Sequence, residues 1–97
     1  MLEAKIEQTV CDYAKDKGLL VYKFTSPNRA AVPDRLFVHP SGYVFFAESK
    51  ASGKIPTPQQ HREHARLRGH NIQVYVVDDI EHGKWMIDQV CAACLGC

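Results

Sequence analysis

Long apolar runs are missing from this chain of 97 residues, and their absence excludes one class of protein. No stretch approaches the roughly 20 consecutive apolar residues that a membrane-spanning helix needs. The start of the chain, Met-Leu-Glu-Ala-Lys-Ile-Glu, lacks the basic segment and the apolar stretch of a secretory signal. We therefore expect a cytoplasmic protein without a membrane partner, whose thiols are mostly reduced.

Repeats, low-complexity tracts and interdomain linkers are absent as well. Apolar residues make up 45% of the chain and charged residues 24%, which are the proportions of an ordinary globular domain rather than of a disordered segment. A chain of this length can build one hydrophobic core. We predict a single domain over residues 1–90 and a short cysteine-containing tail over residues 91–97.

Net charge is also small, at +1, but the charges are unevenly distributed. Residues 23–68 carry eight basic and three acidic side chains, whereas the segments before and after them carry net charges of −1 and −3. Local potential governs the binding of a charged partner more than the sum over the chain does. The basic middle segment therefore favours a nucleic-acid partner, although a solvated surface explains any single Lys or Arg equally well.

Two helices are predicted in the first two thirds of the chain. The first covers about residues 2–17, because apolar side chains recur there at spacings of three and four and Gly18 follows as a stop. The second begins after Thr57, which forms a Thr-x-x-Gln capping box with Gln60, and it ends at Gly69. The first helix should therefore place one face against a core, whereas the second offers a mainly basic surface.

Four strands are predicted from runs of β-branched and aromatic residues. The turn signal Pro-Ser-Gly at residues 40–42 joins the second and third strands into a hairpin. The second helix can cross over between the third and fourth strands, which would then be parallel. We therefore predict an α/β fold with a mixed four-stranded sheet flanked by helices. The strands cover residues 19–24, 34–39, 43–49 and 72–77.

A third helix is predicted near the C-terminus, capped by Asp78 or Asp79, although Gly83 weakens that prediction. Its apolar residues fit two interpretations, which the sequence leaves open: they pack on the sheet as core, or they form an interface with a second copy of the chain. These residues are Trp85, Met86, Ile87 and Val90, with Cys91 on the same side of the helix.

Three residues suggest chemistry at one end of the predicted hairpin. Residues two apart in a strand point to the same face, so Glu48 and Lys50 project side by side from the exposed end of the third strand. Asp34 starts the paired strand, after Pro33 fixes the backbone, so its carboxylate can lie across from Glu48. Two carboxylates and an ammonium group should therefore converge.

Such a group suits phosphodiester hydrolysis. Mg²⁺ or Mn²⁺ binds through carboxylates, a main-chain carbonyl, water and a substrate phosphate, and Lys50 could orient or help to deprotonate the attacking water. The alternative is a purely structural role, in which Glu48 forms an ion pair with Lys50 or Arg35 and Asp34 caps a turn. Because Pro-Asp and Glu-x-Lys occur together, 14 residues apart and at strand ends, we favour the catalytic interpretation.

The same motifs resemble the PD-(D/E)xK nuclease superfamily, and within it the virus-type replication-repair nuclease (VRR-NUC) domain. The resemblance spans most of the chain. It rests on Glu7, Ala31-Val-Pro-Asp-Arg-Leu36, Phe45-Phe-Ala-Glu-Ser-Lys50, Thr57-Pro-Gln-Gln60 with Leu67, and Gly69-His-Asn-Ile-Gln-Val-Tyr-Val. It implies a restriction-endonuclease-like core and a bacterial or viral type of protein. It also implies a metal-dependent DNA endonuclease activity.

The resemblance assigns roles to individual residues. Asp34, Glu48 and the Ser49 carbonyl would bind Mg²⁺ or Mn²⁺, Lys50 would be the catalytic lysine, and Glu7 and Gln60 would support the site. The residues alone do not single out all of these. Glu3 lies closer than Glu7 to the centre of the apolar helix face, and the capping box already explains Gln60.

One departure from the family pattern is a residue of the loop before Asp34. The family usually has Gly where this chain has Ala31, so we expect the loop to follow a different backbone path. Substrate contacts made by this loop would be affected more than catalysis.

Basic residues flank the predicted site and are candidates for nucleic-acid binding. They are Arg29, Arg35, Lys54, Arg62 and Arg66. His61 and His64 lie on the same helix but lack the partner pattern of a metal site, so we interpret both as surface residues.

Cysteines raise the alternative of a zinc site. Cys91, Cys94 and Cys97 form a Cys-x-x-Cys-x-x-Cys pattern, and Cys11 is the fourth cysteine. This is half of the spacing that a four-cysteine site normally shows, so packing or tail residues are the favoured interpretation.

The expected function is that of a structure-selective endonuclease, a homodimer that resolves four-way (Holliday) junctions. A junction has approximate two-fold symmetry and needs two cuts, whereas one chain holds one site. Stand-alone domains of the family it resembles act in this way. The alternatives are a non-catalytic nucleic-acid-binding module and a nuclease for flaps or single strands. A sequence-specific restriction enzyme is less suited to so short a chain.

Overall fold

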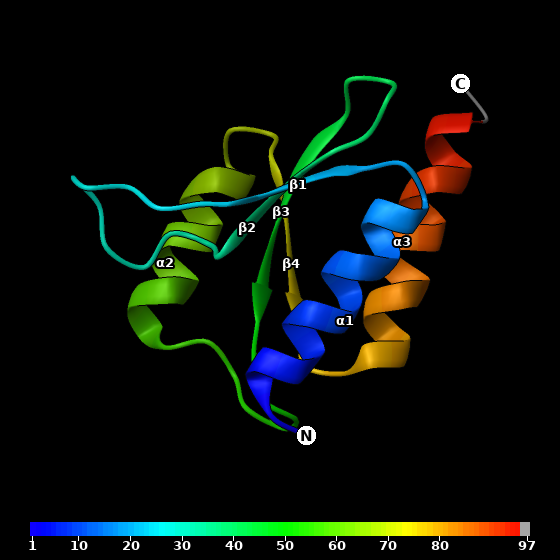
Figure 1. The fold of residues 1–97 in the computed structure, drawn as a ribbon. Helices are drawn as coiled ribbons and strands as arrows, with labels where there is room; N and C mark the ends of the chain where they lie inside the picture. Colours follow the sequence, from blue (N-terminus) through cyan, green and yellow to red (C-terminus); the bar gives the residue numbers. More distant parts are fainter. Residues whose placement is uncertain (96–97) are drawn as a thin grey trace.

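A computed structural model describes residues 1–95, with Leu95 described by its backbone alone, as a sheet between two layers of helices (Figure 1). The helices are α1 (Glu3–Asp16), α2 (Pro58–Arg68) and α3 (Ile80–Leu95), and the strands are β1 (Leu20–Lys23), β2 (Arg35–Val38), β3 (Val44–Ser49) and β4 (Gln73–Val77). Figure 1 shows α1 and α3 packed together on one face of the sheet and α2 on the other. Every predicted element is present, and apart from the C-terminal end of α3 the boundaries differ by about one residue from those predicted.

The sheet has the strand order β1-β2-β3-β4. β2 pairs antiparallel with β1 and β3, whereas β3 and β4 are parallel and α2 is the crossover between them. The predicted α/β fold with a mixed four-stranded sheet is therefore confirmed. Because Arg35 pairs with Ala47, the beginning of β2 lies beside the end of β3. This arrangement brings the Pro-Asp and Glu-x-Lys segments to one end of the sheet.

The hydrophobic core lies between the sheet and the α1–α3 layer. Phe37 and Phe45 stack with their ring centroids 4.9 Å apart, and both are buried beneath the two helices. Gly83 allows α3 to approach, because a Cβ at this position would lie 2.5 Å from Cγ2 of Val10 and 2.9 Å from Cγ1 of Val77. The glycine that weakened the helix prediction is thus required by close packing, and Asp79 caps the helix by accepting a hydrogen bond from the His82 N–H.

The apolar residues of α3 belong mainly to this core. Met86, Ile87 and Val90 are buried in it, so the interpretation that they form an interface with a second chain is wrong for these three. Trp85 faces away and is 57% exposed, and it stacks on His82. Sequence spacing alone could not separate the two cases because both require the same amphipathic pattern.

Cys91 and Cys94 belong to helix α3, although the sequence predicted that a tail begins at residue 91. α3 continues to Leu95, and Cys91 and Cys94 are partly buried against the core, so no structural boundary lies at residue 91. Cys11, Cys91 and Cys94 are free thiols, and Cys97 lies outside the described residues. Among residues 1–95, no helix is both long and apolar enough to cross a membrane.

Ala31 adopts a conformation that glycine favours. Its φ is 65°, in the left-handed region where a Cβ is strained. The alanine therefore occupies a backbone conformation that is typical of glycine, so the loop before Asp34 stores a small amount of strain.

Candidate functional site

Asp34 and Glu48 converge at the joined ends of β2 and β3. Asp34 directly precedes β2, follows the buried Pro33, and accepts a hydrogen bond at Oδ2 from the Ser49 N–H over 3.4 Å. The Glu48 carboxyl lies close enough to Asp34 for the Asp34 side chain to raise its pKa. The structure thus brings together the three residues to which the resemblance assigns metal binding, Asp34, Glu48 and Ser49.

The Glu48 side chain is buried, not exposed at a strand end as expected from the sequence. Only 2% of the residue is exposed, because α2 covers this face of β3. Burial, then the hydrogen bond with Asp34 and the charge of Asp34, raise the pKa of Glu48 to about 8. Without a cation, the Glu48 carboxyl therefore favours its protonated form at neutral pH.

Lys50 lies just beyond β3, where its backbone N–H donates to the Val77 carbonyl over 2.9 Å. This bond continues the β3–β4 pairing and fixes the backbone that carries the side chain. The Lys50 side chain is half-buried, and its charge acts in the opposite direction to Asp34 by lowering the pKa of Glu48. The ammonium group is therefore part of the same electrostatic site as the carboxylates.

His64 is completely buried, so its interpretation as a surface residue is wrong. It has 0% exposure, and its Nε2 lies 3.5 Å from Oε1 of Glu48. The prediction failed because α2 places His64 four residues after Gln60 and three before Leu67, on the helix face that meets the sheet. His61 is exposed, as expected.

Glu7 contacts Arg35 rather than the two carboxylates. Its Oε2 accepts a hydrogen bond from Arg35 Nε over 2.7 Å, which ties α1 to the first residue of β2. Arg35, a candidate phosphate ligand in the sequence, is therefore oriented by Glu7. The α1 carboxylate whose charge contributes to the raised pKa of Glu48 is Glu3.

Gln60 forms the capping box that the sequence predicts. Its Oε1 accepts from the Thr57 N–H over 2.9 Å, and its own N–H donates to Thr57 Oγ1 over 3.1 Å. This pairing accounts for Gln60 structurally, and it fixes the first turn of the helix that carries His64 to Glu48.

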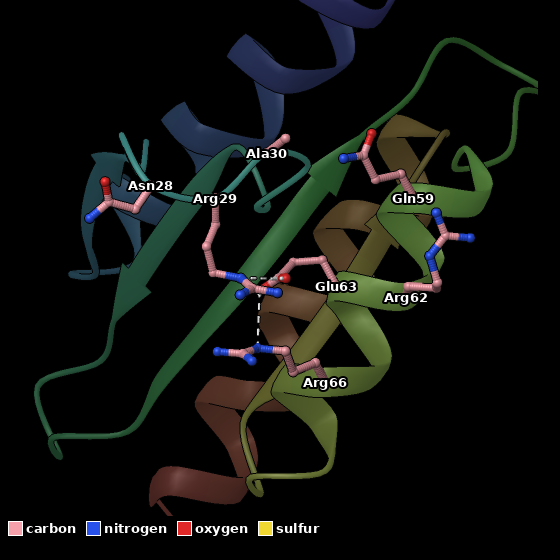
Figure 2. Close-up of a pocket in the computed structure, with 7 residues that line it drawn as sticks. All are labelled: Asn28, Arg29, Ala30, Gln59, Arg62, Glu63 and Arg66. Atoms are coloured by element: carbon pink, nitrogen blue, oxygen red, sulfur yellow. Dashed lines mark hydrogen bonds and ion pairs between the residues drawn. The ribbon is translucent and has the colours of Figure 1, made fainter.

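A basic cleft lies between the loop before β2 and helix α2 (Figure 2). It has a volume of about 470 Å³. Arg29 lines it from the loop, and Arg62 and Arg66 line it from α2, so three predicted phosphate ligands border one cleft. The buried Glu63 orients two of them: its Oε1 lies 3.0 Å from Arg29 Nε and its Oε2 lies 4.0 Å from Arg66 Nε.

Lys54, like Arg35, is a basic candidate that does not line this cleft. Lys54 lies exposed in the loop between β3 and α2, where its N–H donates to the Ala51 carbonyl. The loop is also tied to the chain start, because the amino group of Met1 donates to Ser52 Oγ over 3.1 Å.

The donor set suits a hard cation better than zinc. Across residues 1–95, no group of three or more His, Cys, Asp and Glu side chains is placed to hold a metal ion. A site with two carboxylates, completed by carbonyl, water and phosphate oxygens, matches the preferences of Mg²⁺ or Mn²⁺. Zinc in proteins normally takes three or four side-chain ligands.

The α/β/α fold, with its acidic pair beside a lysine at a hairpin end, defines the class of PD-(D/E)xK nuclease domains. No family model matches the chain. It is 47% identical over 76 residues to "Putative nuclease p44" of Acyrthosiphon pisum secondary endosymbiont phage 1, across 78% of this chain and 82% of that protein.

Solved structures agree with this relationship. One described as a VRR_NUC domain is 30% identical, has a TM-score of 0.83, and is matched over 89% of this chain and 94% of its own. Another, a VRR_NUC domain protein with 15% identity and a TM-score of 0.73, shares the fold over 92% of this chain and 87% of its own. This chain belongs to the VRR_NUC family of nuclease domains.

Sequence reasoning missed two buried polar residues of α2, His64 and Glu63. A signal for His64 was present, since it shares the sheet-facing stripe with Gln60 and Leu67. Glu63 gave no comparable signal, because an acid beside arginines on a helix is usually a solvated ion pair.

Proposed function

We propose that this chain is a Mg²⁺- or Mn²⁺-dependent DNA endonuclease whose catalytic centre contains Asp34, Glu48 and Lys50. The observation that carries the proposal is the buried Glu48 carboxyl at the side of Asp34, which raises its pKa. Two carboxylates this close in a low-dielectric site repel each other unless a proton or a cation lies with them.

The residues fit a divalent cation. Oε1 of Glu48 is buried and has no hydrogen-bond partner among the described residues, so it is a donor atom with unused capacity. The raised pKa of Glu48 reflects the same need for positive charge. Asp34, Glu48 and the Ser49 carbonyl would hold the ion. When bound, it would supply charge to stabilise the phosphoryl oxygens and acidify water.

The chain's own groups then place the reactants. Lys50 orients the attacking water for in-line displacement at phosphorus, while its ammonium charge offsets the charge that develops on the phosphoryl oxygens. As the water oxygen bonds to phosphorus and releases a proton to solvent, the opposite phosphorus–oxygen bond breaks and the leaving oxygen takes up a proton from solvent. Glu7 and Gln60 support this centre indirectly, through Arg35 and through the first turn of α2.

The basic cleft holds the DNA backbone beside this centre. Arg29, Arg62 and Arg66 offer planar guanidinium groups, which bind phosphate oxygens in pairs. Glu63 keeps two of them directed into the cleft and limits their excess charge. Lys54 and Arg35 flank the centre as further groups for binding the backbone.

A four-way junction is the proposed substrate, cut by a homodimer. One chain contains one Asp34–Glu48 pair, and a two-fold junction requires two opposed cuts, so two copies related by two-fold symmetry match the substrate. A domain this small has little surface for reading base edges, which favours recognition of DNA shape.

The catalytic part is tested by cleavage of end-labelled DNA in Mg²⁺, Mn²⁺ and EDTA. We expect cleavage with either cation, none in EDTA, and none by Lys50→Ala, which should still bind DNA. Lys84→Ala, which removes the same charge from α3, is the matched control and should cleave normally. Binding without cleavage under every condition would instead favour a nucleic-acid-binding module.

The substrate and assembly are tested together with a panel of duplex, flap, single-stranded and four-way DNA. Light scattering at micromolar concentration measures the mass of the species that cleaves. A dimer that makes paired cuts in the junction is the expected result. A monomer that cuts only flaps or single strands would reject the resolvase proposal and leave the nuclease proposal intact.

A further inference from the structure

His64 is the residue of α2 that meets the catalytic face of the sheet most directly. The capping box fixes the start of α2, and His64 follows one helical turn after Gln60. The imidazole is completely buried, and its Nε2 lies 3.5 Å from Oε1 of Glu48. The ring therefore forms a wall of the carboxylate site from the side opposite α1 and α3.

This imidazole has polar atoms that packing does not explain. Among the described residues, neither ring nitrogen of His64 has a hydrogen-bond partner, and Oε1 of Glu48 has none either. Burying unpartnered polar atoms is unfavourable, and a leucine would fill the same position without that cost. A histidine here is thus explained better by an interaction with Glu48 than by the core.

Burial, followed by the electrostatic influence of Arg68, His61 and Lys50, lowers the pKa of His64, while Glu63 acts in the opposite direction. This shift favours the neutral imidazole. A neutral imidazole carries a proton on one nitrogen only. When Glu48 is an ionised carboxylate, the favourable tautomer is the one with the proton on Nε2, because a lone pair there would face the carboxylate oxygen.

We propose that His64 is a positioning residue: its Nε2–H donates to Oε1 of Glu48 and fixes the orientation in which that carboxylate binds its cation. The inference rests on the proposed function, because it gives Glu48, which is proposed there as a metal ligand, a hydrogen-bond donor in His64. Shortening the 3.5 Å separation to hydrogen-bond length requires only a small side-chain movement. Partners of this kind orient metal-binding carboxylates and tune their affinity.

The first test compares His64→Leu, which cannot donate, with His64→Gln, whose amide can donate from a position near that of Nε2. Free Mn²⁺ is measured by electron paramagnetic resonance during titration of each folded, DNA-free protein. We expect Mn²⁺ to bind the Leu variant about 10- to 100-fold more weakly, with affinity largely restored by Gln. His61→Leu, a change at the exposed histidine of the same helix, should leave the affinity unaltered.

The same variants separate positioning from packing. In cleavage assays, the Leu variant should need a higher Mn²⁺ concentration while its KM for DNA stays near that of the wild type. In EDTA, it should unfold at a temperature no lower than the wild type does. Equal Mn²⁺ affinity in the wild-type and Leu proteins would overturn the inference while the nuclease proposal stands. A wild-type protein that binds no Mn²⁺ would overturn both.

A measurement on the unaltered chain covers the case in which the Leu variant does not fold. Ring ¹⁵N NMR of Mg²⁺-loaded protein identifies the protonated nitrogen of His64. Protonation on Nε2 alone is expected. Protonation on Nδ1 alone would leave Nε2 without a hydrogen to donate and would contradict the proposed hydrogen bond.

Discussion

Oε2 of Glu7 lies 2.7 Å from Nε of Arg35, and this partly buried ion pair joins helix α1 to the residue that directly follows Asp34. Glu7 therefore neutralises part of the charge of Arg35, the first residue of the β2–β3 hairpin. It links the first helix to the loop that carries Asp34 through one charge-assisted hydrogen bond.

The pair should make a measurable contribution to stability. We expect Glu7→Gln to lower the free energy of unfolding by about 1–2 kcal/mol, because both side chains are mostly shielded from water. A double-mutant cycle with Arg35→Gln, followed by urea unfolding, measures the coupling between the two. If the change in the free energy of unfolding of the double variant equals the sum of the two single changes, the two side chains have no coupling energy and the prediction is wrong.

Stability of the metal-free protein should depend on the ionisation of Glu48. Its pKa in the folded protein is raised to about 8, so the folded chain holds this proton more tightly than the unfolded chain does. The resulting stabilisation is complete below the ordinary pKa of a glutamate and is lost as pH rises to about 8. Urea unfolding in EDTA, from about pH 5 to about pH 8.5, measures this decline as a slope of the free energy of unfolding against pH.

Glu48→Gln provides the control for that slope, because glutamine does not titrate. Its stability should vary less with pH over the same interval. An equal decline in both proteins would assign the pH dependence to other groups.

Ala31 should be a site of stabilising substitution. Its φ of 65° strains an alanine, whereas glycine adopts this conformation freely. Ala31→Gly is therefore expected to raise the free energy of unfolding by about 1 kcal/mol, the left-handed penalty less the extra chain entropy of glycine. Ala30→Gly, at the neighbouring exposed position, should not stabilise. A loss of stability in Ala31→Gly would contradict the assigned backbone conformation.

The basic cleft should contribute to the salt dependence of DNA binding. Replacing Arg62 or Arg66 by Gln is expected to weaken binding and to reduce the slope of log K against log salt by about 0.9 for each duplex phosphate that is no longer neutralised. Fluorescence anisotropy measures the slope, with Lys50→Ala as the background because this variant is expected to bind DNA without cleaving it. Lys84→Gln, which changes the same charge on α3, should leave the slope unchanged; an equal reduction there would mean that only net charge matters.

The fold could be predicted from the sequence because its signals are local. Apolar spacing along α1, the capping box at Thr57 and the turn before Tyr43 each determine a structure within a few residues. Glu48 and Lys50 were recognisable for the same reason, since they occur in one short motif.

The remaining features depend on how elements pack, which no local pattern encodes. Gly83 is a poor helix residue that the approach of α1 requires, and His64 is a polar residue that α2 turns toward Glu48. The placement of Met86 in the core instead of an interface likewise depends on how the helix layer packs. Each case is a tertiary interaction that overrides the ordinary preference of the residue.

Calorimetric titration of Mn²⁺ into the wild-type protein and into Asp34→Asn tests most directly whether Asp34 and Glu48 form a cation site. Asparagine keeps the size of the side chain and an oxygen that can accept from the Ser49 N–H, but it removes half of the carboxylate charge. We expect saturable binding by the wild type and at least about tenfold weaker binding by the folded variant, which corresponds to about 1.4 kcal/mol or more. Equal affinities in the two proteins would contradict the assignment of Asp34 as a ligand and, with it, the proposed catalytic centre.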